Sequence, residues 1–177
     1  MRFEGADIVL GPLRDEDSDV LFRWINNREL VIHSAQFHTV ERCDHDEWFD
    51  SIRRRDDVRI FGIRLRSDDT LVGSCQLHSI STAHNTAELQ IRIGESSQQN
   101  RGYGSQAVRL LLDYGFKELG LHRVWVHVLS SNGAAISVYE KAGFIREGRL
   151  REAACIENSR VDLIILGILR REYELLD

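Results

Sequence analysis

The chain has 177 residues, 42% of them hydrophobic and 29% charged, and its formal net charge is -5. This length predicts one domain over residues 1–177 with a sizeable core, and this composition excludes a disordered or fibrous chain. The negative balance also argues against a nucleic-acid-binding protein, which needs a basic face to displace the counterions of phosphates.

Hydrophobic periodicity predicts strands and helices along the whole chain. A strand at Asp7–Leu13 precedes a helix that opens at Asp15 and ends by Asn27. Further along, three strands joined by turn-like segments predict an antiparallel meander. The expected class is mixed α/β (α+β), a mostly antiparallel central sheet of about seven strands flanked by about four helices. The other expected elements are the helices Asp44–Arg54, Gly104–Leu119 and Asn132–Ala142 and the strands Val58–Leu65, Leu71–Ile80, Thr86–Ile93, Arg123–Leu129, Ile145–Glu152 and Val161–Leu169.

The cysteines and the apolar runs bear on the compartment. Cys43, Cys75 and Cys155 are odd in number and widely separated, without a CxxC pair. This pattern predicts a reducing, cytoplasmic setting and no bound metal. The N-terminus lacks an apolar run followed by a small-residue cleavage site, and the longest apolar run, Leu163–Leu169, is far short of the ~20 residues of a membrane span. We therefore expect neither a secretion signal nor a membrane partner.

A predicted strand, the loop GESSQQNRGYG and a predicted helix form a combination suited to phosphate. The first amides of a helix have no internal acceptor, and the helix dipole adds partial positive charge there. Gly102 and Gly104 remove side chains where a pyrophosphate would approach the main chain, and Arg101 supplies a charged donor. A tight turn explains two glycines equally well.

Two other phosphate motifs compete for these residues. A P-loop fails because no lysine follows Gly104. GYGSQA matches the GxGxxA of a dinucleotide fold, but seven residues separate Gly94 from Gly102, and the next strand lacks the acidic residue that binds a ribose. A dinucleotide-binding module therefore stays a minor alternative.

The spacing Gln99-x-x-Gly102-x-Gly104 resembles the Q/R-x-x-G-x-G/A signature of the GNAT superfamily of N-acetyltransferases. The segment SNGAAISVYEKAGF, residues 131–144, is similar to the family's asparagine-bearing strand end and the tyrosine-bearing helix after it. The chain's beginning, IVLGPLRDEDSDVLFRW, and its end, VDLIILGILRREYELL, resemble the subgroup of RimJ and RimL type, which acetylates the N-termini of ribosomal proteins. Ser96 and Ser97 depart from the aromatic residue or proline often found before the glutamine.

The resemblance implies a GNAT-like sheet and acetyl-CoA as cosubstrate. It further implies that the pantetheine arm lies where the strands ending near Ile93 and Leu129 splay apart. Asn132 resembles the family's cofactor-contacting asparagine, although a helix cap explains it equally well. The expected cofactor-binding residues are Ile91, Arg92, Ile93, Gln99, Asn100, Arg101, Gly102, Tyr103, Gly104, Ser105, Asn132 and Tyr139.

Acetyl transfer to an amine requires a base for the amine and an acid for the departing thiolate. Tyr139 is the candidate acid, because the resemblance places the corresponding tyrosine beside the thioester sulfur; its helical spacing alone fits a core residue as well. Glu88 is the candidate base and His78 the second option. Their strands have matching polar rows, and a register joining polar face to polar face brings His78 near Glu88 and Gln76 near Gln90. A solvent-facing meander is the alternative.

His127 shares a strand face with Trp125 and Leu129, which favours a packed histidine over a catalytic one. Acceptor contacts are expected from Asn26–Thr39, including His33, Gln36 and His38, and from the second helix. The acceptor itself stays open between a small-molecule amine, such as a polyamine, an amino sugar or an aminoglycoside, and a protein N-terminus. A catalytically silent acyl-CoA-binding sensor is the alternative function, and both monomer and homodimer are compatible with the sequence.

Overall fold

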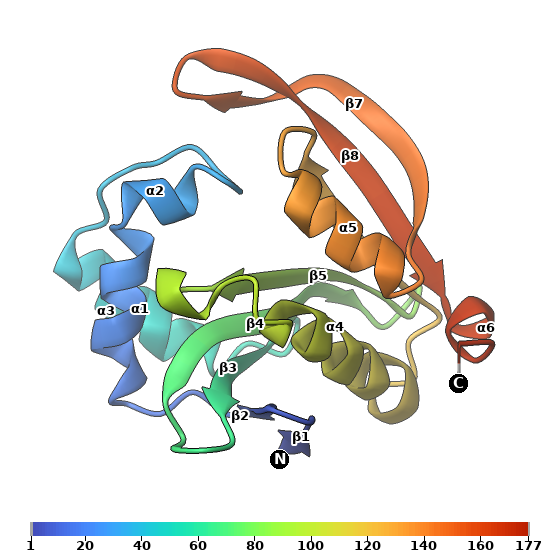
Figure 1. The fold of residues 1–177 in the computed structure, drawn as a ribbon, viewed down its shortest axis with the longest axis horizontal. Helices are drawn as coiled ribbons and strands as arrows, with labels where there is room; N and C mark the ends of the chain where they lie inside the picture. Colours follow the sequence, from blue (N-terminus) through green and yellow to red (C-terminus); the bar gives the residue numbers. More distant parts are fainter. Residues whose placement is uncertain (1, 177) are drawn as a thin grey trace.

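The computed structural model describes residues 2–176 (Figure 1). Its helices are α1 (Asp17–Ile25), α2 (Arg28–Val31), α3 (Arg42–Ile52), α4 (Tyr103–Asp113), α5 (Gly133–Lys141) and α6 (Arg170–Tyr173). Its strands are β1 (Phe3–Glu4), β2 (Ile8–Gly11), β3 (Arg59–Leu65), β4 (Leu71–Ser81), β5 (Thr86–Ile93), β6 (Arg123–Leu129), β7 (Ile145–Ile156) and β8 (Ser159–Leu169). A 3-10 turn spans Ser96–Gln98, and a π-helical turn, Tyr114–Glu118, continues α4.

Within the described residues the strands form one sheet in the order β1-β2-β3-β4-β5-β6-β8-β7. β5 and β6 pair in parallel, and the other neighbours pair antiparallel. The predicted class and the meander of β3, β4 and β5 are confirmed. The sheet has eight strands rather than about seven, and there are six helices rather than about four. The additional elements, β1, α2 and α6, are two to four residues long, too short for a hydrophobic period to be read.

The apolar side chains form two clusters. The larger one includes Val108 and Leu111 of α4, Leu77 of β4 and Val124 of β6, all with no exposed surface. This follows from the apolar stripe of α4, whose residues recur every three to four positions. The smaller cluster joins α1 and α3 to the sheet and consists of Leu13, Leu21, Trp24, Phe49 and Leu71. Helices α1 to α3 therefore gather at one end of the molecule (Figure 1).

A buried ion pair fixes the start of α1. Asp17 and Arg64 are both buried, and the Arg64 Nη2 donates to Asp17 Oδ1 at 2.5 Å. The second carboxylate oxygen of Asp17 accepts from the Arg14 amide at 2.7 Å. Because both carboxylate oxygens have donors, the charge of Asp17 is compensated inside the protein.

Strands β7 and β8 form a long hairpin, which arches over α5 in Figure 1. Its two-residue turn, Glu157 and Asn158, has φ angles of 50° and 64°, the left-handed conformation of a type I′ turn. At the tip, Glu157 pairs with Arg28 of α2, and its amide donates to Gln36 Oε1 at 2.8 Å. The hairpin tip thus contacts α2 and the segment that follows it.

No helix among residues 2–176 combines the length and the apolar content that crossing a membrane requires.

Candidate active site

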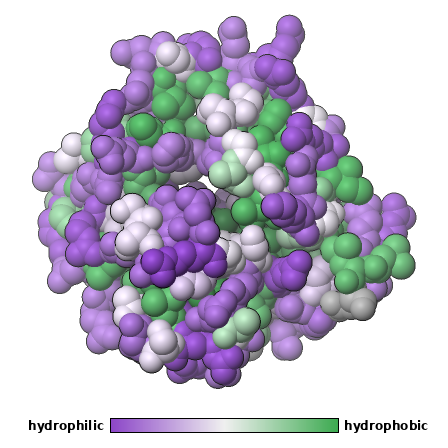
Figure 2. Space-filling model, viewed as in Figure 1, coloured by the Kyte–Doolittle hydropathy of each residue, from purple (hydrophilic) through white to green (hydrophobic). Residues whose placement is uncertain are grey.

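A cleft opens where β5 and β6 diverge. The two strands pair only from Thr86 to Glu88, against Arg123 to Trp125. Beyond these residues the β6-facing edge of β5 has no strand partner, because the rest of β6 pairs only with β8. The divergence implied by the resemblance is confirmed. A cavity of about 500 Å³, here called the strand cleft, occupies this space, and Figure 2 shows a hollow in the region between α2 and α5.

The strand cleft is lined from both halves of the chain. The lining residues are His33, Ser34, Ala35, Gln36, Gln76, His78, Glu88, Leu89, Gln90, Ile91, His127, Val128, Leu129, Asn132, Ala135, Tyr139, Ala154, Cys155, Ile156 and Leu163. The segment predicted to contact the acceptor therefore borders the strand cleft through its residues 33–36, whereas His38 is not part of the lining.

The loop between β5 and α4 ends in free main-chain amides. Gly102, with a φ of 81°, precedes the helix, and no side chain caps this end. The first hydrogen bond across the helix start runs from the Gln106 amide to the Gly102 carbonyl at 3.1 Å. The amides of Tyr103, Gly104 and Ser105 come before it and have no acceptor among the described residues. Such unpaired amides at a helix N-terminus are suited to an anion.

The two glycines of this loop are not required by protein packing. A Cβ at Gly102 or Gly104 would meet no atom within 4 Å. Both positions therefore leave the approach to the helix N-terminus open. The exposed Gln99 side chain donates from its Nε2 to the Ile93 carbonyl at 3.2 Å and holds the loop to the end of β5.

Tyr139 of α5 lies at the inner end of the strand cleft. It is 6% exposed, and its ring packs edge-on against Phe144 with centroids 5.4 Å apart. Burial, together with the nearby Cys75 and Glu88, raises the pKa of its hydroxyl above the ordinary value. The hydroxyl donates to no atom of residues 2–176. Tyr139 is thus both a core residue and a protonated group that faces the strand cleft.

Glu88 lies between two imidazoles. The predicted register is confirmed, because His78 pairs with Glu88 and Gln76 with Gln90. The His78 Nε2 is 3.8 Å from one carboxylate oxygen of Glu88. The other oxygen accepts a hydrogen bond of 3.1 Å from the Nδ1 of His127. A carboxylate that holds Nδ1–H fixes the tautomer of a neutral imidazole and leaves Nε2 as its acceptor.

The prediction for His127 was wrong in one respect. Its ring contacts Trp125 at a centroid distance of 4.6 Å, but it is exposed to the strand cleft and bonded to Glu88. The parallel register pairs Glu88 with Trp125, which brings His127, two residues further along the same face, beside Glu88. Periodicity within one strand does not show this pairing.

Asn132 has its side chain engaged within the protein. Its Oδ1 accepts from the Ala135 amide at 3.0 Å, which confirms the helix cap. Its Nδ2 donates to the carbonyl of His33 at 3.0 Å and so ties α5 to the segment after α2. Its assignment to the cofactor stays a prediction.

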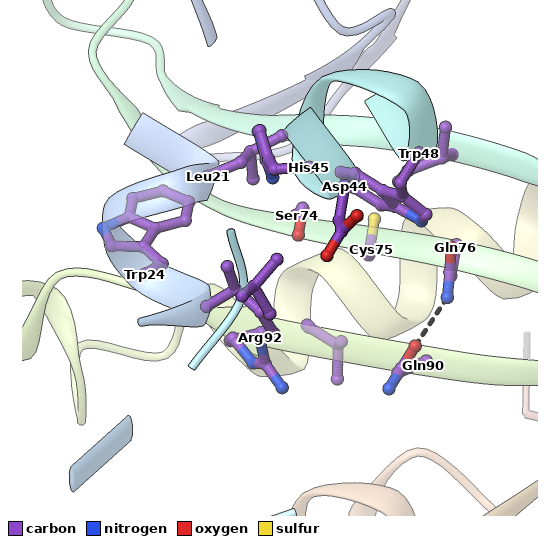
Figure 3. A pocket seen from close by; sticks show the side chains of 14 residues that line it. Leu21, Trp24, Asp44, His45, Trp48, Ser74, Cys75, Gln76, Gln90 and Arg92 are labelled. Atoms are coloured by element: carbon purple, nitrogen blue, oxygen red, sulfur yellow. Dashed lines mark hydrogen bonds between the residues drawn. The ribbon is translucent and has the colours of Figure 1, made fainter. Parts of the chain in front are cut away.

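A second cavity of about 420 Å³, here called the side cavity, adjoins the strand cleft. Figure 3 shows its walls, with Leu21 and Trp24 from α1, Asp44, His45 and Trp48 from α3, Ser74, Cys75 and Gln76 from β4, and Gln90 and Arg92 from β5. Gln76, Gln90 and Ile91 line both cavities, and Gln76 Nε2 donates to Gln90 Oε1 at 2.5 Å.

Two residues of the side cavity that the sequence did not indicate hold its walls in place. Trp24 is 3% exposed and donates from its indole nitrogen to Glu95 at 2.9 Å. His45 is 3% exposed, and its Nε2–H donates to the Ser18 carbonyl at 2.9 Å. Burial lowers the pKa of His45, so its ring is neutral. Within residues 2–176, no three His, Cys, Asp or Glu side chains are grouped so that they could hold a metal ion.

Comparison with known proteins places this geometry in context. Residues 7–145 match the family described as Acetyltransferase (GNAT) domain. The chain is 35% identical over 102 residues to the spermidine N(1)-acetyltransferase of Vibrio cholerae, a match covering 58% of each chain. It is 31% identical over 102 residues to the putative ribosomal N-acetyltransferase YdaF of Bacillus subtilis, covering 58% of this chain and 55% of that one. These matches thus span somewhat more than half the length of each curated relative.

A solved structure extends the likeness to nearly the whole fold. The V. cholerae spermidine N-acetyltransferase, in complex with CoA and spermine, superposes with a TM-score of 0.89 at 27% identity. The match covers 96% of this chain and 99% of that one.

Proposed function

This chain belongs to the GNAT acetyltransferase family, and from that premise we propose that it transfers the acetyl group of acetyl-CoA to a primary amine. One observation carries the proposal. The unpaired edge of β5 leads from the strand cleft, which Tyr139 lines, to the loop that ends in the free amides of α4. A phosphate site, a strand edge and a proton donor are what an acyl-CoA thioester requires.

The residues present fit acetyl-CoA, which supplies an activated acetyl thioester. The amides of Tyr103, Gly104 and Ser105 bind the diphosphate, with Arg101 and Asn100 beside them. The edge of β5 from Ile91 to Ile93 offers main-chain groups to the amides of the pantetheine arm, as strand edges do for extended peptides. Gln99 acts indirectly by fixing the loop to β5.

Glu88 is the proposed base. Its carboxylate takes a proton from the ammonium form of the acceptor and leaves the neutral, nucleophilic amine. An α-amine with a pKa of about 7.7 to 8 needs less of this help than an alkylamine near 10.4. His127, bonded to Glu88 at 3.1 Å, and His78, at 3.8 Å, carry the proton onward to solvent. His78 is the second candidate for the base itself.

Tyr139 is the proposed acid. As the amine nitrogen bonds to the acetyl carbon and the carbon–sulfur bond breaks, the Oη–H of Tyr139 donates its proton to the departing sulfur. The further proton that the nitrogen loses on becoming an amide returns to the tyrosine oxygen. A raised pKa keeps the proton of Tyr139 on the hydroxyl at neutral pH. Because the hydroxyl has no protein acceptor in residues 2–176, it is free to turn toward the sulfur.

We propose that the acceptor is a primary amine on a small molecule. The names of the relatives introduce two specific classes, polyamines and protein N-termini. The resemblance of both chain ends to the RimJ and RimL subgroup supports including N-terminal peptides among the candidates. Neither class is built into the proposed mechanism, which requires only an amine that reaches Glu88.

An acceptor screen that measures free CoA tests the proposal. Wild-type protein is assayed with acetyl-CoA and a panel of amines including spermidine and N-terminal peptides. Tyr139→Phe, which keeps the ring and removes only the hydroxyl, is expected to lower kcat by roughly 10²-fold or more. Glu88→Gln, which keeps the side-chain shape and an acceptor for His127, is expected to lower the rate and alter its dependence on pH.

The alternative is a catalytically silent acyl-CoA sensor. It predicts heat on titration with acetyl-CoA but no amine-dependent release of CoA. An unchanged rate and pH profile in Glu88→Gln would remove Glu88 as the base and leave His78. Absence of any heat with acetyl-CoA would overturn both functions.

A further inference from the structure

Among the arginines of residues 2–176, Arg64 is buried and has a carboxylate partner, whereas Arg92 is half-buried and has none. Arg64 is paired with Asp17. Arg92 makes one side-chain hydrogen bond, from its Nη2 to the Ser34 Oγ at 3.2 Å. No carboxylate of residues 2–176 forms an ion pair with it.

Burying a guanidinium without an anion is costly, because the charge loses hydration and gains no partner. The pKa of Arg92 shows this, since burial lowers it and no neighbouring charge raises it again. A neutral hydroxyl such as that of Ser34 satisfies one of five donors. The remaining donors are available to a molecule in the side cavity, which Arg92 lines.

The other titratable groups of the side cavity do not supply the missing charge. Asp44 lies on α3, on a different wall from Arg92, and is exposed to solvent (Figure 3). His45 is neutral and donates to the Ser18 carbonyl. The buried Cys75 thiol is also neutral, because burial raises its pKa. Arg92 is therefore the half-buried charge of this cavity, and the exposed Asp44 forms no ion pair with it.

A second observation concerns Gln76, which pairs with Gln90, the residue midway between Glu88 and Arg92 on β5. Gln76, which lines both cavities, donates from Nε2 to Gln90, while its Oε1 is buried with no donor among the described residues. Glu88, Gln90 and Arg92 occupy one face of β5, where alternate residues point the same way. This face thus presents the Glu88 carboxylate, the Gln90 amide and the Arg92 guanidinium in a row, with the unpaired Oε1 of Gln76 on the neighbouring strand β4.

We propose that the side cavity binds an oxyanion on the acceptor, a carboxylate or a phosphate, through the Arg92 guanidinium, while the acceptor's amine reaches Glu88. This inference rests on the proposed acetyl transfer. Glu88 and Arg92 are four residues apart on the strand, about 13 Å between Cα atoms. The acceptor is therefore an amine separated from its anionic group by several bonds, rather than a polycation.

The shared chemistry of carboxylate and phosphate follows from the planar fork of arginine, which binds either group with two parallel hydrogen bonds. A second ammonium in the side cavity would face the same positive charge. Polyamines, the substrates named for the relatives from V. cholerae, are thus expected to be poor acceptors here.

A series of amines with one chain length and different ends tests the proposal. 6-Aminohexanoate, 6-aminohexyl phosphate, hexylamine and 1,6-diaminohexane are compared by kcat/KM with acetyl-CoA saturating. Wild-type protein should favour one of the two anionic amines over hexylamine by roughly 10- to 100-fold, with the effect mostly in KM, and diaminohexane should be poorest. The better of the two anionic amines identifies the source of the oxyanion.

Variants at Arg92 change the end group that is preferred. Arg92→Leu should level the anionic amines with hexylamine, Arg92→Lys should keep part of the preference, and Arg92→Glu should favour diaminohexane. Arg171→Leu removes a guanidinium that is exposed on α6 and lines neither cavity, and it should leave the order unchanged. The KM for acetyl-CoA should stay the same in Arg171→Leu, and the Arg92 variants are compared at saturating acetyl-CoA because residue 92 also borders the proposed pantetheine site.

Equal or better use of diaminohexane by the wild type would overturn the inference, as would an Arg92→Leu protein that keeps the preference for anionic amines. Failure of the acetyl transfer itself gives a different result, no CoA release with any amine. In that case calorimetry with 6-acetamidohexanoate and with 6-acetamidohexyl phosphate decides. Heat that is lost in Arg92→Leu supports the anion site, and no heat with either compound refutes it.

Discussion

Replacing Gly94 with alanine tests how Trp24, in the wall of the side cavity, is connected to the loop between β5 and α4. A Cβ built at Gly94 lies 2.0 Å from Cδ2 and 2.1 Å from Cε2 of Trp24. Ordinary carbon contacts are about 3.5 to 4.0 Å, so the indole has to retreat by roughly 1.5 Å. Trp24 is 3% exposed, so its retreat disturbs the cluster around it or narrows the side cavity that it lines.

The expected destabilisation has two parts. Overpacking of this kind costs about 1 to 3 kcal/mol. The retreat also breaks the hydrogen bond of 2.9 Å from the Trp24 indole to Glu95, and a bond to a charged group contributes about 1.5 to 3 kcal/mol. Gly94→Ala should therefore lower the free energy of unfolding by roughly 2.5 to 6 kcal/mol.

The same change should weaken cofactor binding. Glu95 is followed directly by the turn Ser96–Gln98, which leads to the amides of α4. Displacing Glu95 shifts this loop, so we expect the KM for acetyl-CoA to rise about tenfold, equivalent to about 1.4 kcal/mol.

Urea unfolding and steady-state kinetics measure the two effects, and a second substitution identifies their cause. Trp24→Leu removes the atoms that the new Cβ would meet. In that background, Gly94→Ala should be milder, with a coupling free energy above about 1 kcal/mol. A loss below about 1 kcal/mol for Gly94→Ala alone, or no coupling to Trp24, would refute the steric explanation.

Three further results follow from buried or shifted groups. Asp17→Asn leaves the Arg64 guanidinium buried without its carboxylate, so the free energy of unfolding measured in urea should fall by about 3 to 5 kcal/mol. A change under about 1 kcal/mol would show that the ion pair contributes little to stability. Because burial lowers the folded-state pKa of His45, the unfolded state binds a proton more readily, and the free energy of unfolding should decline as the pH falls below about 6.5. His45→Gln should show a flatter decline. An identical slope in the variant and the wild type would contradict this explanation. Since the pKa of Tyr139 is raised, its hydroxyl should stay protonated, and the acetyl-transfer rate should not fall through its ionisation up to about pH 10. A fall in rate below this pH that disappears in Tyr139→Phe would argue against a protonated tyrosine.

The alternation of polar and apolar residues along β4 and β5 was the basis for predicting how these strands pair. Two neighbouring strands with polar rows join those rows if their apolar faces are to share one core, and this was sufficient to predict that His78 meets Glu88 and Gln76 meets Gln90. The predicted bounds of the strand Thr86–Ile93 agree with β5 for the same reason. Local periodicity is reliable where one face of a strand is buried.

Features that depend on distant segments were not predictable in this way. His127 was assigned to packing because the parallel pairing of β5 with β6 has no signature in either strand. The resemblance grouped Arg92 with the cofactor-binding residues, and the lack of a carboxylate beside its side chain depends on every element that surrounds it. Asn132 resembled a cofactor contact, and its bond to the His33 carbonyl joins residues 99 positions apart.

The contacts between the hairpin tip and the region of α2 bear on how easily the strand cleft opens. The tip is held by the pair Arg28–Glu157 and by the hydrogen bond to Gln36, both at exposed side chains. Exposed pairs of this kind contribute about 0 to 1 kcal/mol each. Parting these two contacts therefore requires little free energy and leaves the pairing of the sheet strands intact.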